Sequence, residues 1–199
     1  MTKKLITLLS FLILTALNAQ EVTERMTIPG PLDYAGTEFL LTRSSHPSKV
    51  LYVQDYIPRD ATLADFGEMV PIYYFQKDIN IEDAVKQKVQ EIQRKMENDK
   101  FASVNLTESP DGSDFVVDYV ITKSPEGKTP SAEFNIYRFK EINNGTSKDL
   151  MILVYTKRSN GDLKTLTKNF SKSKNFELDR MIGFKVPELK IIEGTELTK

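Results

Sequence analysis

The chain has no cysteine and no tryptophan, and its only histidine is His46. Without cysteine there is no disulfide, no thiol nucleophile and no thiolate to bind zinc. A Ser-His-Asp triad would have to use His46 as its base, and we expect His46 to lie in an exposed polar turn, Ser44–Ser48. No Gly-x-Ser-x-Gly motif marks a nucleophile elbow. These absences leave few routes to catalysis, and the sequence predicts no metal and no cofactor.

Long apolar runs are also lacking, except for one at the start of the chain. The basic start Met1-Thr2-Lys3-Lys4 precedes an apolar stretch from Leu5 to Leu17. Ala19, before Gln20, is a small residue of the kind found at a cleavage site. Positive charge, an apolar stretch too short to span a bilayer, and a small residue are typical of a secretory signal peptide. We therefore expect 1–19 to be cleaved near Ala19-Gln20 from a bacterial protein that is periplasmic or extracellular. No later apolar run predicts a transmembrane span.

Neither sign of charge dominates. Of the 27 basic side chains, Lys3 and Lys4 belong to the predicted signal, so 25 remain against 28 acidic ones, a net charge of about −3 with His46 neutral. A general nucleic-acid binder would be strongly basic, so no nucleic-acid partner is expected. Residues 20–199 are enough for one domain with its own hydrophobic core.

Hydrophobic periodicity predicts a single α+β domain over 20–199. The clearest helix follows Asn80, because apolar residues recur at steps of three and four: Ile81, Ala84, Val85, Val89, Ile92 and Met96. Strands are expected at 37–42, 49–57, 102–107, 114–122, 132–142 and 150–156, the last of them central.

The remaining segments complete the predicted order β-β-α-β-β-β-β-α. A short helix is expected over 61–69, the aromatic segment 71–75 is left unassigned, a last helix starts near Asp162, and the tail is frayed from 188. The expected architecture is an antiparallel sheet of about six strands, with the long helix and the C-terminal helix packed on one face.

A basic helix face is one candidate binding surface. Lys164, Lys168 and Lys172 recur every four residues, with Lys174 close by, while Leu163, Leu166 and Phe170 fall largely on another face. A basic amphipathic helix can lie on an anionic membrane or bind an acidic partner. The alternative is a helix that packs its apolar face on the sheet and turns its lysines to water.

A group of aromatic residues is a second candidate binding surface. Tyr73, Tyr74 and Phe75 follow Tyr52 and Tyr56 in the same third of the chain. They could line an apolar cleft between helix and sheet. The alternative is that they fill an ordinary core.

The sequence favours a non-catalytic exported binding module whose partner is an envelope protein, a lipid or a small apolar ligand. The alternative function is a hydrolase that uses carboxylates or a Ser-Lys pair. Asp118 is the one acid between apolar neighbours in a predicted strand, although ordinary alternation would turn it to solvent. Ser171 and Lys174 have Ser-x-x-Lys spacing, but the partner motifs of the penicillin-recognising enzymes are absent.

Overall fold

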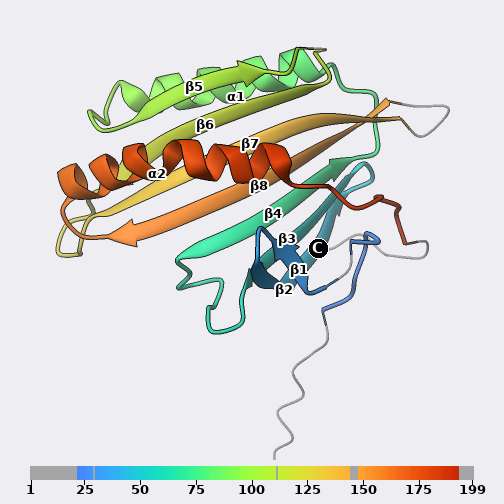
Figure 1. Cartoon of the computed structure of the whole chain (residues 1–199), viewed down its shortest axis with the longest axis horizontal. Coiled ribbons are helices and arrows are strands. Elements are labelled where there is room, and N and C mark those ends of the chain that lie inside the picture. Colours follow the sequence, from blue (N-terminus) through green and yellow to red (C-terminus); the bar gives the residue numbers. More distant parts are fainter. Residues whose placement is uncertain (1–21, 29, 111, 144–147, 193–199) are drawn as a thin grey trace, which may run out of the picture.

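The computed structural model describes residues 22–28, 30–110, 112–143 and 148–192 (Figure 1). The chain order is four strands, a helix, four strands and a second helix. The elements are β1 (Leu32–Tyr34), β2 (Thr37–Ser48), β3 (Leu51–Pro58), β4 (Glu68–Phe75), α1 (Ile81–Met96), β5 (Ser103–Glu108), β6 (Asp114–Lys123), β7 (Ser131–Asn143), β8 (Lys148–Asn160) and α2 (Leu163–Gly183).

All eight strands form one antiparallel sheet in the order β1-β2-β3-β4-β8-β7-β6-β5. The helix α1 carries the chain from β4, inside the sheet, to β5 at the far edge. The expected α+β class with an antiparallel sheet is confirmed, but the sheet has eight strands rather than about six. Leu150–Thr156 does lie within an interior strand, β8.

The missed strands are β1, which is very short, and β4. The helix predicted over 61–69 is wrong, since Thr62 and Asp65 exchange backbone hydrogen bonds in a turn and β4 begins at Glu68. Pro71, which interrupted the apolar pattern, lies in β4 in register with Asp55 of β3.

The two helices cover opposite faces of the sheet, which corrects the prediction that both pack on one face (Figure 1). In α1, Val85 and Ile92 pack on the face of β6 that carries Val117. In α2, Phe170 and Met181 belong to the core on the other face. Side chains alternate across a strand, and β6 and β7 are apolar on both faces, so each face needs its own cover.

Both helices begin directly after a capping side chain, Asn80 for α1 and Asp162 for α2. Asn80 accepts a hydrogen bond from the backbone N–H of Asp83 at 2.8 Å, and Asp162 accepts one from Thr165 at the same distance. Each cap satisfies one of the N–H groups that a helix start leaves unpaired. The last helix, α2, continues as far as Gly183.

Two segments expected to be exposed are buried. His46 lies in β2 rather than in a turn, is 7% exposed and stacks on Tyr52 with ring centroids 3.9 Å apart. The described part of the tail is not frayed, because Ile191 pairs with Met26 and Leu189 is buried. The predicted signal peptide and cleavage site lie outside the described residues. Neither α1 nor α2 combines the length and apolar character that a membrane-crossing helix requires.

Candidate functional site

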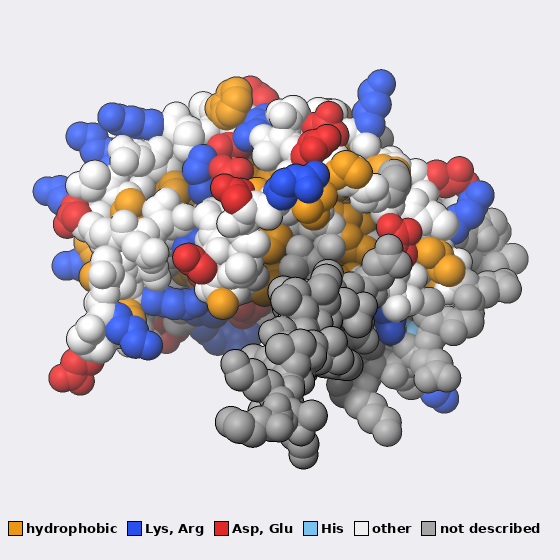
Figure 2. All heavy atoms as spheres, turned by 90° about the horizontal axis from the view of Figure 1, so that it is seen from below, with side chains coloured by type: hydrophobic (Ala, Val, Ile, Leu, Met, Phe, Trp, Pro, Cys, Tyr) orange, Lys and Arg blue, Asp and Glu red, His pale blue; other side chains and the backbone are white. Residues whose placement is uncertain are grey.

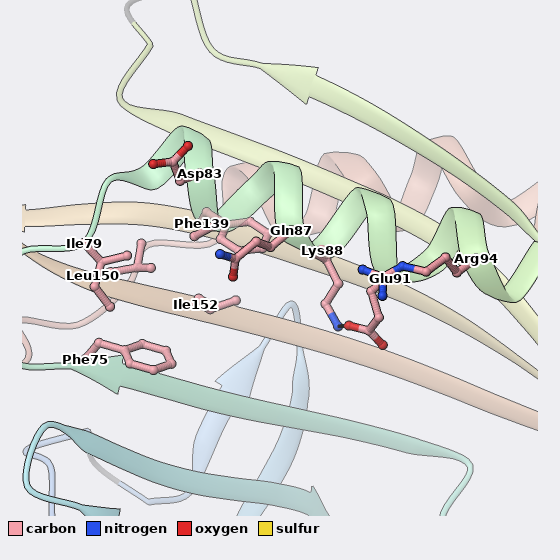
Figure 3. Close-up of a pocket in the computed structure, with 11 residues that line it drawn as sticks. Phe75, Ile79, Asp83, Gln87, Lys88, Glu91, Arg94, Phe139, Leu150 and Ile152 are labelled. Atoms are coloured by element: carbon pink, nitrogen blue, oxygen red, sulfur yellow. Dashed lines mark hydrogen bonds and ion pairs between the residues drawn. The ribbon is translucent and has the colours of Figure 1, made fainter.

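A groove of about 530 Å³ runs between α1 and the face of the sheet formed by β4, β7 and β8 (Figure 3). Its floor is apolar and consists of Phe75, Ile79, Phe139, Leu150 and Ile152. Its wall is one side of α1 and consists of Asp83, Ala84, Gln87, Lys88, Glu91 and Arg94.

Strand register builds the floor. Phe75 of β4 pairs with Leu150 of β8, and Ile152 of β8 pairs with Phe139 of β7, so that these side chains share one face of the sheet. Phe139 and Leu150 are almost fully buried, while Phe75 and Ile152 are partly exposed. Together with Ile79, which is also partly exposed, this pair is therefore the apolar surface that a ligand would cover.

Helical spacing builds the wall. Lys88 and Glu91, one turn apart, form an ion pair with 2.9 Å between Nζ and Oε2, and Lys95 lies 2.6 Å from the other carboxylate oxygen. Partial burial alone would raise the pKa of Glu91, but the hydrogen bonds from Lys95 and Lys88 hold that pKa below its usual range. Within the groove lining, the charge of Lys88 is thus paired with that of Glu91, while Lys95 contacts the same carboxylate from outside the lining.

Arg94 is the open cation of the groove. Its Nε lies 3.3 Å from the backbone oxygen of Gln90, and no carboxylate of the described residues forms an ion pair with it. Asp83 lies at the opposite end, about 16 Å away at 1.5 Å per helical residue. The groove therefore has an elongated apolar floor with one exposed positive end.

Tyrosines lie on the same face of the sheet beyond the floor. The Lys88 ammonium is 4.4 Å from the ring centroid of Tyr137 and 5.7 Å from that of Tyr119, a favourable cation–π arrangement. Burial raises the pKa of Tyr73 to about 12 and also raises the pKa of Tyr119. These two phenols are neutral at physiological pH and add no negative charge beside the groove.

The aromatic cleft predicted from Tyr73, Tyr74 and Phe75 is only partly assembled. Alternation along β4 sends Tyr74 to the opposite face, where its hydroxyl donates to Asp149. Tyr73 shares the face of Phe75, but only Phe75 lines the groove.

The basic face of α2 is present in part. Lys164, Lys168 and Lys172 are exposed, and none of them forms an ion pair with a described residue. Figure 2 shows Lys and Arg side chains gathered at the end of the molecule where α2 begins in Figure 1. Lys174 does not join this face, because its ammonium lies 2.8 Å from Asp118 on the sheet.

Asp118 is 2% exposed, so the expectation that it faces solvent is wrong. It lies on the face of β6 that α2 covers, and the helix shields it. Asp118, Ser171 and Lys174 all line a smaller cavity of about 170 Å³ between β5, β6, β7 and α2, called here the β5–α2 cavity. The structure thus brings together the three residues named for the hydrolase hypothesis.

Sequence reasoning missed most of the groove. Arg94 and Gln87 looked like ordinary solvated positions of an amphipathic helix, and Ile152 looked like a core residue. The one available signal was the uninterrupted apolar run Leu150–Thr156 of β8, which indicated that both of its faces are covered. Among the described residues, no three His, Asp or Glu side chains are placed to hold a metal ion.

Comparison with known proteins supports a family assignment only. No curated protein matches the chain, and no solved structure matches it. A protein-family model matches residues 26–186, a span that includes every strand and both helices described above. Because this match covers more than half of the chain, the protein belongs to that uncharacterised family.

Proposed function

We propose that this protein is an exported, non-catalytic binding module, and that the groove beside α1 holds an elongated amphiphile with an anionic end. The apolar part of the ligand lies on Phe75 and Ile152, and its acidic end meets Arg94. A medium-length fatty acid is the simplest molecule of this kind.

The observation that carries the proposal is the composition of the groove. Ligand sites are usually concave and mostly apolar, with a few polar groups that fix orientation. Here the partly exposed floor is hydrophobic, the Lys88–Glu91 pair is self-neutralised, and Arg94 is the cation left open. Such an arrangement favours a ligand with one apolar body and one negative end.

The residues of the hydrolase hypothesis are arranged in a way that favours binding over catalysis. The Lys174 ammonium donates to the Asp118 carboxylate at 2.8 Å. A lysine must offer a lone pair to act as the base for a serine, and this ion pair uses the charged form instead. The groove itself brings together no Ser, His or Cys side chain.

The test is a calorimetric titration of the purified full-length chain with dodecanoate, dodecanol and dodecyltrimethylammonium, each kept below its micelle concentration. We expect dodecanoate to bind with one-to-one stoichiometry and to bind more tightly than the cationic amphiphile. Arg94→Gln should weaken dodecanoate binding about threefold to tenfold, as expected for a partly exposed charged contact, and leave dodecanol binding unchanged. Lys86→Gln, the matched loss of a cation elsewhere on α1, should change neither.

Two variants test the groove, one in its floor and one in its wall. Ile152→Glu places a carboxylate under the acyl chain, and Ala84→Phe narrows the groove without adding charge. Both should abolish dodecanoate binding while the circular dichroism spectrum stays that of the parent. Unchanged affinity in a folded Ala84→Phe variant would reject the groove as the ligand site.

The basic face of α2 supports contact with an anionic surface as a second role. The first turn of α2 contains no acidic residue and does contain Lys164. Positive charge is unfavourable at a helix N-terminus because the helix dipole is positive there. Helix stability therefore does not explain the presence of Lys164 in the first turn. Attraction to an anionic membrane or an acidic protein would explain it.

A further inference from the structure

We propose that the β5–α2 cavity is a second binding site, separate from the groove, and that it takes one neutral sugar ring. The cavity lies on the opposite face of the sheet from the groove, beneath the first half of α2. Its volume of about 170 Å³ is below the roughly 300–1,000 Å³ of sites for drug-sized molecules. The space therefore suits a single small ring rather than a chain.

Both polar partners of the Asp118 carboxylate contact the same oxygen. Asn105 on the neighbouring strand donates from Nδ2 to Oδ1 at 3.1 Å, and the Lys174 ammonium lies 2.8 Å from the same oxygen. No described residue donates to Oδ2, although Asp118 is 98% buried. Asp118 lines the cavity, so Oδ2 can accept a hydrogen bond from a hydroxyl group of a molecule held there.

The charges in the cavity cancel. Asp118 and Lys174 form a close pair, so a ligand with a net charge would gain from one partner and be repelled by the other. A hydroxyl group suits both, because it donates to a carboxylate and accepts from an ammonium, and both bonds are charge-assisted. The Ser103 and Ser171 hydroxyls also line the cavity and can bond to further hydroxyls.

The remaining wall is aromatic. Phe101, Phe134 and Phe170 line the cavity, and the rings of Phe134 and Phe170 stack with centroids 6.0 Å apart. Aromatic faces carry negative partial charge, and the C–H groups on one face of a sugar ring carry positive partial charge. A sugar ring offers hydroxyls at its edge and C–H groups on its face, which matches a polar wall opposite an aromatic one.

The test is titration of the isotopically labelled full-length chain with glucose, N-acetylglucosamine, glucosamine and glucuronate, followed by amide chemical shifts. We expect the two neutral sugars to shift resonances of 103–105, 118 and 167–174 with saturable, millimolar-range binding. The positively charged and negatively charged sugars should bind about tenfold more weakly. Saturable shifts confined to other residues, or no saturable shift with any sugar, would overturn the proposal.

Variants separate binding from folding. Asn105→Ala, on the exposed edge strand, should lower sugar affinity about threefold to tenfold by removing one hydrogen-bonding group. Asp118→Asn should lower it more, since it also removes the charge. Thr107→Ala, two residues along the same strand and outside the cavity, is the matched control.

Equal affinity for the parent, Asn105→Ala and Asp118→Asn would reject the site even if a sugar binds elsewhere. Loss of sugar binding with intact dodecanoate binding would leave the groove untouched, so the two sites can fail independently.

Discussion

Arg138 of β7 and Asp114 of β6 form an ion pair that also holds the end of α2. The Arg138 Nε lies 2.8 Å from Asp114 Oδ2, while its Nη1 donates to the backbone oxygens of Phe184 at 3.0 Å and Met181 at 3.2 Å. The last carbonyl groups of a helix have no partner within the helix. Because the side chains of Arg138 and Asp114 are each only 13% exposed, this contact fixes α2 to the sheet.

Arg138→Gln should therefore lower the free energy of unfolding substantially. Breaking a buried pair costs about 3–5 kcal/mol, but Lys140 stays 2.9 Å from Asp114 and compensates in part, so we expect a loss of about 2 kcal/mol or more. Urea denaturation followed by circular dichroism measures it. Lys123→Gln, which removes an exposed pair with 3.5 Å between the charged atoms, is the control and should cost less than about 1 kcal/mol. Equal losses in the two variants would show that the Arg138 contact does not hold α2.

The basic face of α2 predicts association with anionic lipid. Vesicles that contain phosphatidylglycerol should bind the full-length chain at low salt and release it as salt rises, since the Debye length falls to about 8 Å at physiological ionic strength. The triple change Lys164→Gln, Lys168→Gln and Lys172→Gln should abolish sedimentation with these vesicles. The single change Lys174→Gln should not reduce it, because Lys174 is engaged with Asp118. Undiminished binding by the triple variant would discard the membrane role of this face.

Buried tyrosines predict alkaline instability. Burial raises the pKa of Tyr56 and of Tyr73 to about 12, and burial also raises the pKa of Tyr34, Tyr119 and Tyr155. Between about pH 10 and 12 the unfolded chain loses phenolic protons that the folded chain keeps, so stability is fully present below pH 10 and falls as pH rises. Each such tyrosine contributes up to about 1.4 kcal/mol per pH unit in that window.

Urea midpoints measured across this pH range test the prediction, and Tyr73→Phe should make the decline shallower. In parallel, ultraviolet absorbance should detect little phenolate from the buried residues of the folded chain near pH 10. Ionisation of all eight tyrosines near pH 10 without unfolding would contradict the assigned burial.

Local patterns in the sequence predict the elements better than their arrangement. The helix after Asn80 follows from its spacing and its cap, and β6 follows from its apolar run between two turn signals. The sequence does not predict which face of the sheet each helix covers, because β6 and β7 are apolar on both faces and either face could pack against α1. β4 was missed since Pro71 and three adjacent aromatic residues mask its alternation, although Tyr74 and Phe75 do alternate in the fold.

The candidate sites depend on contacts between distant segments, which a single sequence does not reveal. Ile152 and Arg94 are far apart in the chain and line one groove only because α1 packs over β5, β6 and β7 and leaves β8 next to its exposed side. Asp118 was expected at a solvated face because nothing in its own strand indicates that α2 returns to cover it. The Ser171–Lys174 spacing did mark a cavity, but the ion pair with Asp118 that defines its chemistry lies outside the motif.

The most direct test of the groove is to locate a bound ligand by paramagnetic broadening. A fatty acid with a nitroxide near its methyl end is added to a methyl-labelled sample of the full-length chain, and the same sample is measured after reduction of the nitroxide. The groove predicts selective loss of the methyl signals of Ile79, Leu150 and Ile152, with the signals of Met181 and Leu189 on the opposite face unchanged. Broadening centred on Met181 and Leu189, or none that depends on the nitroxide, would contradict a ligand site between α1 and the sheet.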